Sequence, residues 1–520
     1  MTREKPLRER TPILHQGLVL KRLLAALSRG KSAAPNGAGV DAWSAHDAGD
    51  LLPPHDFQVL ADDPDVARGI VAFNAGAWDQ ALEALGHVTP RDDATRMALG
   101  LLRAHALREA WRFDDALTTL DALQGGGPDP ARALALRGDC LLCLGRYAEA
   151  IKALEAARLA AGPRARGIAL LAGQLAQWAD DWDGAITEYR RSLEDHPHIA
   201  FARSQLGYAL IRAGHHREGY LELRRVGFDT RFLPMEKSSP VWNGEATDAR
   251  PLLLVAEFGL GDMVQYLRYA GALRQRMSPG TPLWLKAPMP LHRLAGSTGW
   301  FDRVLAPHEE FTGGMHSPLM QLPLLLGMED DTRPLPFPYL QPGADDLRRF
   351  DMLLANRNRP RVGLCWAGKR IEIDARRSLP FATLRPLVDT FAQRVDFINL
   401  QAGEERHQAS DAPFTDPPDA FVDVANTAAL CANLDLVICV DTAIAHIAGA
   451  MAVPTWVLSR PDVDWRWETP GRHEGQPSLG FYPQTRLFRH PHGELDWVAV
   501  VRQAGLALDA WLRDFGHRTK

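Results

Sequence analysis

The chain of 520 residues is too long for a single hydrophobic core, so about three domains are expected. Its 46% hydrophobic and 24% charged residues are typical of a soluble globular protein, and no apolar run reaches the roughly 18 residues of a membrane span. A formal net charge of −5 argues against general nucleic-acid binding. Five scattered cysteines predict free thiols in a reducing, cytoplasmic compartment.

Residues 1–60 are interpreted as a basic tail and a linker. Lysine and arginine outnumber acidic residues in residues 1–31, and Lys21-Arg22 interrupts the apolar piece Leu18–Leu27, which does not suit a signal peptide. The alternative is a short amphipathic helix that makes peripheral contact with the inner membrane. Residues 32–60 are rich in Ala, Gly, Pro and Asp, which is typical of a linker.

A period of 34 or 35 residues runs through residues 61–232. Small residues recur at steps of 35, 34, 35 and 34, and two further series keep the same steps. The three series are Gly69, Ala104, Gly138, Gly173 and Gly207; Trp78, Phe113, Tyr147, Trp182 and His216; and Ala81, Ala116, Ala150, Ala185 and Gly219. They predict about five helix-turn-helix units in which the small residues permit close helix crossings.

These repeats resemble the tetratricopeptide repeat (TPR) family. The resemblance implies a right-handed superhelix with a groove that binds protein segments, whereas the alternative is a spacer or a dimerisation arm. Gly125–Pro128 lies between two repeats and is predicted to be a turn. Cys140 and Cys143 lie within a repeat and are interpreted as buried helix residues.

Strand and helix patterns alternate in residues 233–345. Pro251–Ala256 predicts a buried strand, which the glycine-flanked turn Gly259–Asp262 connects to a helix over Met263–Arg276. Further strands are predicted at Pro282–Lys286 and Arg303–Leu305, and a helical piece is predicted to open at His316–Leu319. Alternation of this kind predicts an α/β half with a parallel sheet.

Residues 346–500 predict a second α/β half, and residues 501–520 a C-terminal helix. Strands are expected at Arg361–Trp366, Val395–Gln401 and Ala420–Asp423, before a β-α-β unit at Asp435–Leu458. Ligands bind outside the carboxyl ends of parallel strands, and a helix N-terminus there attracts phosphate. The unit therefore predicts a phosphate-bearing ligand near Asp441-Thr442, unless these two residues only cap the helix.

Two aromatic and basic segments, PDVDWRWETP and FYPQTRLFRH, are predicted to be loops at the rim of a cleft between the halves. Asp462 and Asp464 match a metal-binding DxD pattern, but they lie in a loop rich in Pro and Trp. We interpret them as loop residues and expect no metal.

Three motifs in this order resemble the ADP-heptose–lipopolysaccharide heptosyltransferases, glycosyltransferase family 9. They are GLGDMVQYLRY, WAGK…RRSLP and DLVICVDTAIAHIAGAMAVPTWVL…DWRWE…YPQTRLFR. Specifically, the chain resembles bacterial TPR-repeat proteins whose C-terminal domain is related to these enzymes. The resemblance covers about residues 240–500. It implies a TPR α-superhelix followed by a GT-B unit of two Rossmann-like halves, the first on the acceptor side and the second for the nucleotide sugar. It also implies metal-independent, inverting sugar transfer.

Inverting transfer needs a base and a means of holding the departing diphosphate. Asp262, on the glycine-flanked turn, is the candidate base, and the alternative is a helix cap. A helix N-terminus supplies roughly +0.5 charge, whereas a nucleoside diphosphate carries about two negative charges, so cations are required. The candidates follow the strand at Arg361–Trp366 and are Lys369, Arg370, Arg376 and Arg377-Ser378.

The family's nucleotide-sugar site matches Asp441, Thr442 and His446. Asp441 would accept hydrogen bonds from sugar or ribose hydroxyls, Thr442 would donate to phosphate, and His446 lies one turn along the helix. Three further residues are candidates for ligand contact. These are Gly261, which permits close approach of the backbone, and Gln401 and Thr427, which would contact the base or ribose.

Together these features predict a cytoplasmic glycosyltransferase with a nucleotide sugar as co-substrate and no resident cofactor. The repeats would recruit a protein acceptor or an assembly partner. One alternative is transfer to a cell-envelope glycan or lipopolysaccharide. Another is a non-catalytic TPR adaptor that keeps the GT-B fold. The identity of the donor and the oligomeric state stay open.

Overall fold

The computed structural model describes residues 60, 63–74, 77–123, 130–161, 168–195, 197, 200–227, 239–247, 249–330, 335–354, 358–368, 374–467, 481–489 and 495–518. The predicted basic tail and linker, the turn at Gly125–Pro128, Lys369 and Arg370 lie outside these residues. None of the described helices is long and apolar enough to cross a bilayer.

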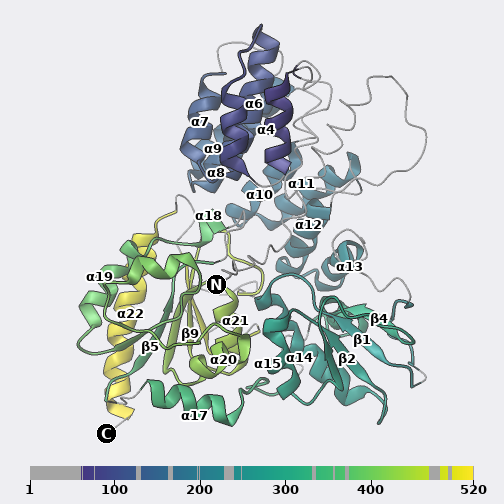
Figure 1. The fold of residues 1–520 in the computed structure, drawn as a ribbon, viewed down its shortest axis with the longest axis vertical. Helices are drawn as coiled ribbons and strands as arrows, with labels where there is room; N and C mark the ends of the chain where they lie inside the picture. Colours follow the sequence, from purple (N-terminus) through teal and green to yellow (C-terminus); the bar gives the residue numbers. More distant parts are fainter. Residues whose placement is uncertain are drawn as a thin grey trace, which may run out of the picture. The chain divides into compact units, whose positions relative to one another are not determined.

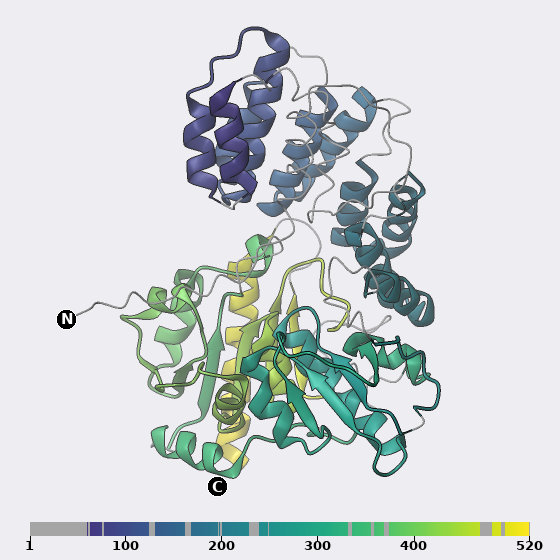
Figure 2. The ribbon, with the colours of Figure 1, turned by 45° about the vertical axis from the view of Figure 1, so that its right-hand side comes forward.

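Ten helices in the described residues form five successive hairpins, and Figure 2 shows the first three in purple and blue. The predicted aromatic series, including its final His216, marks the start of every second helix. The hairpins are α4 (Pro64–Asn74) with α5 (Trp78–Gly86), α6 (Asp93–Glu109) with α7 (Phe113–Asp121), α8 (Pro130–Cys143) with α9 (Tyr147–Ala161), α10 (Ala169–Trp178) with α11 (Trp182–Asp195), and α12 (Ala200–Arg212) with α13 (His216–Gly227).

The small residues of the period lie where the two helices of a hairpin cross. A Cβ atom at Gly69 would lie 2.8 Å from Leu85 Cγ, and one at Gly207 would lie 2.9 Å from the Leu223 side chain. Such distances are too short for a methyl group, so glycine permits the close crossing. The turns inside the hairpins add a further periodic series. It consists of Trp111, Gly145, Asp180 and Gly214, which all have positive φ.

The contacts divide the chain into two compact units. One comprises residues 1–175 and 187–205, and the other comprises residues 176–186 and 206–520. The predicted boundary between residues 232 and 233 therefore lies inside the second unit. The last hairpin, α12–α13, contributes most of its described residues to the unit that contains both sheets.

A four-stranded parallel sheet forms the first α/β half, with the strand order β3-β2-β1-β4. The strands are β1 (Leu252–Val255), β2 (Leu283–Lys286), β3 (Arg303–Leu305) and β4 (Met315–Pro318). The helical elements are α14 (Leu260–Arg276), η2 (Met289–Leu291), α15 (His292–Ser297), η3 (Leu319–Gln321) and α16 (Leu322–Leu325). β1 is buried along its whole length, as its apolar run predicted.

A six-stranded parallel sheet forms the second half, with the order β10-β9-β8-β5-β6-β7. Its strands are β5 (Arg361–Cys365), β6 (Asp396–Asn399), β7 (Phe414–Thr415), β8 (Leu436–Val440), β9 (Thr455–Ser459) and β10 (Thr485–Arg489). Its helices are α17 (Ala344–Leu353), α18 (Asp374–Arg377), α19 (Phe381–Phe391), η4 (Glu404–Ala409), α20 (Val424–Ala432), α21 (Ala443–Ala450) and α22 (Trp497–Arg518). Figure 1 shows α19 and α22 on one face of this sheet and α20 and α21 on the other.

Three predicted elements were wrong. Residues 315–318 form strand β4 instead of opening a helix, because Met315 pairs with Leu252 of β1 and the helical turn begins only at Leu319. Ala420–Asp423 is not a strand, because Asp423 caps α20 through the Asn426 N–H (2.8 Å). Part of the predicted loop FYPQTRLFRH is strand β10, which extends the sheet beside β9.

The predicted fold class is confirmed: helical repeats precede two parallel α/β halves. One hydrophobic core includes Tyr220 and Leu223 of α13, α14 and its neighbours, and α20 and α21 of the second half. A separate core on the far face of the six-stranded sheet includes α19 and α22. The two halves are therefore joined through one continuous core at the helices that follow β1 and β8.

Candidate functional site

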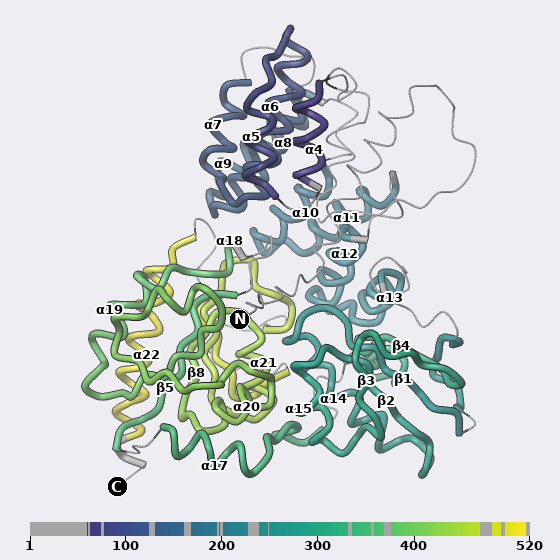
Figure 3. Tube along the Cα trace, viewed as in Figure 1, coloured from purple at the N-terminus to yellow at the C-terminus, as the bar shows by residue number. Residues whose placement is uncertain are grey.

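The β-α-β unit at Asp435–Leu458 is confirmed as β8, α21 and β9. α14 follows β1 in the first half as α21 follows β8 in the second, and the two helices pack side by side (Figure 3). The N-terminal turn of α14 therefore comes close to the carboxyl edge of the second sheet. Most predicted site residues lie around this junction.

Asp262 lies in the first turn of α14, because the helix begins at Leu260 and not at the predicted Met263. The Gly259 N–H donates to Asp262 Oδ2 (3.0 Å), so the carboxylate does cap the helix. Its Oδ1 accepts from Arg466 Nη2, which belongs to the loop after β9. Asp262 thus joins the two halves in addition to capping its own helix.

Arg466 is the cation at the centre of this junction. Its Nε donates to Gln265 Oε1 (2.9 Å), and its Nη1 donates to both carboxylate oxygens of Asp464 (2.8 and 2.9 Å). Burial acts against its charge, but Asp262 and Asp464 raise the pKa of Arg466 well above its ordinary value. The DWRWE segment that contains Arg466 is part of the family resemblance, but no role was predicted for Arg466, because its contacts depend on the path of a loop without periodic pattern.

Asp441 follows β8 directly and precedes Thr442, the N-cap residue of α21. Burial, together with the charge of Asp464, raises the pKa of Asp441, while Arg377 and Arg460 act in the opposite direction. Two cations therefore act on the charge of this carboxyl group.

Thr442 makes no side-chain hydrogen bond to the N-terminal N–H groups of α21. Its hydroxyl lies 3.9 Å from Cys365 Sγ, at the carboxyl end of β5. The positive end of α21 therefore lacks the side-chain cap that α14 has.

Arg460 follows β9 and is a second residue that the sequence did not single out. Its Nε donates to the Asp462 carbonyl (3.1 Å) and lies 3.0 Å from Asp462 Oδ1, and Arg376 Nη1 lies 3.2 Å from Asp462 Oδ2. Arg460 Nη1 is buried and makes no hydrogen bond within the described part of the chain. A buried donor without a partner requires an explanation, and a bound anion would supply the acceptor.

Arg377 and Ser378 lie over the turn that follows β5. The Gly368 N–H donates to Ser378 Oγ (2.9 Å), and a Cβ atom at Gly368 would lie 2.1 Å from Arg377 Nη2. Gly368 therefore permits the guanidinium to lie against the backbone. The charge of Arg377 acts to lower the pKa of Asp441, whereas Lys369 lies outside the described residues.

Gly261 and His446 form the contact between α14 and α21. A Cβ atom at Gly261 would lie 2.6 Å from His446 Cδ2 and 3.3 Å from Ala443 Cα. His446 is buried, its Nδ1 lies 2.9 Å from the Tyr482 hydroxyl, and its ring lies 4.8 Å from the Trp467 ring. Burial, with Arg466 acting in the same direction, lowers the pKa of His446 to about 3, so the imidazole is neutral. Both residues serve helix packing in this structure.

Gln401 and Thr427 make hydrogen bonds to the backbone. Gln401 Oε1 accepts from the Trp366 and Ala367 N–H groups (3.0 and 2.8 Å), and its Nε2 donates to the Ala367 carbonyl (3.1 Å). Thr427 Oγ1 donates to the Ala420 carbonyl (2.8 Å). Thr427 is the fourth residue of α20 and not its start. These bonds hold the loops around the sheet edge.

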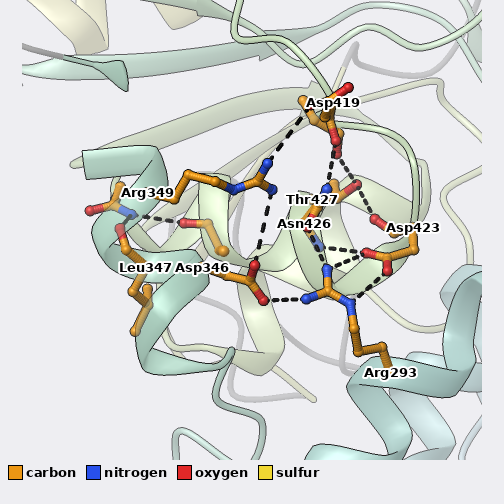
Figure 4. Close-up of polar contacts among 11 residues, drawn as sticks. Arg293, Asp346, Leu347, Arg349, Asp419, Asp423, Asn426 and Thr427 are labelled. Atoms are coloured by element: carbon orange, nitrogen blue, oxygen red, sulfur yellow. Dashed lines mark hydrogen bonds and ion pairs between the residues drawn. The ribbon is translucent and has the colours of Figure 1, made fainter. Parts of the chain in front are cut away.

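Figure 4 shows a polar cluster that connects α15 of the first half to α17 and α20 of the second. Arg293 donates to both oxygens of Asp423 (2.8 and 2.9 Å) and also pairs with Asp346. Arg349 lies 4.0 Å from Asp346 and 3.8 Å from Asp419. Although burial acts the other way, Arg293 lowers the pKa of Asp423. The cluster is a second connection between the two halves.

Glu257 and Phe258 directly precede the turn, and the sequence predicted no role for either residue. Glu257 accepts from the Leu319 and Met320 N–H groups (2.9 and 3.0 Å), and burial raises its pKa to about 8. Phe258 has φ of +68° and a largely exposed ring. A bulky residue in this conformation is strained, which is common beside functional sites.

Among the described residues, no group of three or more His, Cys, Asp or Glu side chains could hold a metal ion. Asp462 and Asp464, which match the DxD pattern, both pair with arginines. The five cysteines are free and buried.

Comparison with known proteins gives similarities to both parts of the chain. A family model described as tetratricopeptide repeat matches residues 101–166. The chain is also similar to Protein FlbA of Caulobacter vibrioides, with 27% identity over 479 residues, which cover 84% of this chain and 76% of FlbA.

Among solved structures, ADP-heptose LPS heptosyltransferase II of E. coli matches with a TM-score of 0.38 and 12% identity, over 51% of this chain and 99% of that one. A glycosyl transferase family 9 protein of Veillonella parvula matches with a TM-score of 0.40 and 11% identity, over 52% and 100%. MamA matches with a TM-score of 0.26 and 19% identity, over 30% and 91%. Residues 101–166 thus match the repeat that the period of 34 or 35 residues predicted.

Proposed function

We propose that the protein is a glycosyltransferase that moves a sugar from a nucleotide-sugar donor to an acceptor hydroxyl, with inversion and without a metal. We further propose that the acceptor is a protein recruited by the repeats and that transfer takes place in the cytoplasm. The observation that carries the proposal is the junction of Asp262 and Arg466, beside the N-terminus of α21.

Asp262 is the proposed base. Its two oxygens accept from Gly259 and Arg466, and each carboxylate oxygen has two lone pairs, so capacity for an acceptor hydroxyl is left. Both bonds fix the direction of the carboxylate, which favours proton transfer in a defined geometry. Helix capping and base function are therefore compatible in this residue.

The donor side is the end of β8 with Asp441, Arg377 and Arg460. The charges of both arginines act on the Asp441 carboxyl, and α21 adds its positive end. Two guanidinium groups and a helix N-terminus match the roughly two negative charges of a nucleoside diphosphate. Asp441 is suited to accept a hydrogen bond from a sugar or ribose hydroxyl.

The reaction follows from these roles. The acceptor oxygen forms a bond to the anomeric carbon while Asp262 takes the hydroxyl proton. The bond from the anomeric carbon to the phosphate oxygen breaks, and the diphosphate leaves with the electron pair. Arg377, Arg460 and the N–H groups of α21 stabilise the charge that develops on the leaving oxygen.

A panel of nucleotide sugars tests the activity directly. Each donor is incubated with the full-length protein, and released nucleoside diphosphate and free sugar are measured by mass spectrometry. We expect slow hydrolysis of at least one donor, and the same donor should raise the melting midpoint because it binds the folded state. If no donor is hydrolysed and none raises the midpoint, the adaptor function is favoured instead.

The acceptor is tested in cells that carry labelled sugar. For the wild-type protein, we expect labelled sugar in the protein fraction. With Asp262→Asn, we expect no label in that fraction. Label that appears in the lipopolysaccharide or glycan fraction instead would favour the envelope acceptor.

The free thiols support the proposed cytoplasmic location.

A further inference from the structure

We propose that the last helical hairpin, α12–α13, is part of the candidate catalytic site, and that Tyr208 of this hairpin positions Arg466 and, through it, Asp262. The hairpin ends the repeat series in sequence, yet residues 206–227 belong to the compact unit of the two sheets. The inference rests on the proposed function for the role of Asp262.

The hairpin shares the hydrophobic core of α14. Ile211, Tyr220 and Leu223 are buried in the same cluster as Val264 and Tyr266 of α14. The hydroxyl groups of Tyr220 and Tyr266 lie 3.2 Å apart, and Tyr266 follows Asp262 by one helical turn. The hairpin is therefore packed on the helix that carries the proposed base.

Tyr208 of α12 contacts the loop that holds Asp262. Its ring is stacked on Trp465, with centroids 6.2 Å apart and an interplanar angle of 15°. The guanidinium carbon of Arg466 lies 5.8 Å from the Tyr208 ring and 4.6 Å from the Trp465 ring. Both distances are within cation–π range.

This arrangement restricts the long side chain of Arg466. Its in-plane donors are used by Asp262, Asp464 and Gln265, and the two rings pack against it. An arginine on a loop otherwise has considerable rotamer freedom. Tyr208 reduces that freedom and so fixes the donor that holds Asp262 Oδ1.

A second aromatic residue of the repeat region also packs against an arginine of the second α/β half. Trp178, at the end of α10, is buried, and its ring lies 5.7 Å from the guanidinium carbon of Arg376. Arg376 pairs with Asp462, which also pairs with Arg460. Residues 176–186 belong to the same compact unit as these arginines. Both arginine clusters at the carboxyl edge of the second sheet thus have an aromatic residue of the repeats beside them.

The test uses full-length protein with Tyr208→Ala, Tyr208→Phe and the control Trp511→Ala, an aromatic residue of α22. Donor hydrolysis is measured as kcat and KM. If Tyr208 positions Arg466, the alanine variant loses about tenfold in kcat, with donor KM within about twofold, because donor binding is unchanged. The phenylalanine variant keeps the ring contacts with Trp465 and Arg466, so we expect it to retain most of the wild-type kcat. A wild-type kcat in Tyr208→Ala, or an equal loss in Tyr208→Phe, would overturn the inference.

A thermal cycle separates this inference from the proposed function, because it needs no turnover. Tyr208→Ala should lower the melting midpoint by about 2 °C or more in the wild-type background, and by clearly less in an Arg466→Met background, since the contact is already lost. Equal shifts in the two backgrounds would contradict the contact even if the protein proves to be an enzyme. If the cycle shows coupling but no donor is hydrolysed, the proposed function and the catalytic role of the hairpin fail, whereas the positioning of Arg466 by Tyr208 stands.

Discussion

Helices α14 and α21 occupy equivalent places in the two halves, and their N-termini differ in one respect. At α14, the carboxylate of Asp262 reaches back to the Gly259 N–H, whereas at α21 the side chain of Thr442 makes no bond to the helix N–H groups. A helix end that carries a carboxylate repels an anion, and an uncapped end beside two arginines attracts one. In the proposed function, this difference separates a proton-accepting side from a phosphate-binding side.

The largest effect is expected for Asp262→Asn. The amide oxygen can still accept from Gly259, so the helix keeps its cap, but the base is lost. We expect kcat to fall about 10³-fold, within the range for loss of a general base, while nucleoside diphosphate binding persists. Asp345→Asn on α17 is the control, because Asp345 is almost fully exposed. Equal loss of nucleoside diphosphate binding and of turnover in Asp262→Asn would show that Asp262 is not the base.

Gly261→Ala tests whether the two helix ends must be this close. The new methyl group would lie 2.6 Å from His446 Cδ2 and 3.3 Å from the Ala443 backbone, which cannot give way easily. We expect a loss of about 1–3 kcal/mol in the free energy of unfolding, measured by denaturant titration. Gly296→Ala in α15 is the matched control, because nothing lies within 4 Å of its new Cβ atom. A stable Gly261→Ala protein would show that the helices can separate.

His446 makes the helix contact sensitive to acid. Its pKa is about 3 in the folded protein against 6.5 in the unfolded chain, so its contribution is complete above pH 6.5 and is lost as the pH falls toward 3. Between pH 6.5 and 4.5 the folded state should lose about 2 kcal/mol through this residue. His446→Asn should flatten the pH dependence of unfolding, and the same substitution at the exposed His87 serves as the control. An unchanged slope in His446→Asn would contradict the buried neutral imidazole.

Thr442→Ala should have the smallest effect on stability. Because the hydroxyl makes no capping bond, we expect a change in unfolding free energy below about 0.5 kcal/mol, less than for a typical N-cap residue. Donor affinity should fall by about fivefold if the hydroxyl donates to phosphate. A stability loss of about 1 kcal/mol or more would mean that Thr442 is a structural cap.

Periodic features were predicted from the sequence, and loop contacts were not. The repeats were recognisable because three residue series kept one period, and β8-α21-β9 because a buried strand and a small-residue helix differ in pattern. β4 was missed because MHSP has no strand propensity, and only its pairing with β1 makes it a strand. Long-range pairing of this kind overrides local preference.

Most of the predicted site residues lie around the junction of α14 and α21, and two arginines that were not predicted lie there with them. Their roles in a ligand site stay predictions. Asp262, Arg377 and Asp441 followed from motifs at strand ends, where ligand residues are expected. Arg460 and Arg466 lie in the loop after β9, and their partners are up to 204 residues away along the chain, so no spacing rule could identify them. Gln401 was chosen for its position at the end of a strand, and His446 for its match to the family's nucleotide-sugar site. Both are buried, and their polar atoms make internal contacts.

The difference between the two helix ends is tested most directly by binding of a nucleoside diphosphate to Arg377→Ala and to Asp262→Asn. Affinity is measured by calorimetry for the diphosphate and for the parent nucleoside, with the exposed Arg348→Ala as control. We expect Arg377→Ala to weaken diphosphate binding by roughly 10- to 100-fold and nucleoside binding hardly at all, because a charge-assisted bond contributes about 1.5–3 kcal/mol. Asp262→Asn should bind both as the wild type does. Diphosphate binding that is unaffected in Arg377→Ala but weakened in Asp262→Asn would place the phosphate at the wrong helix and contradict the account.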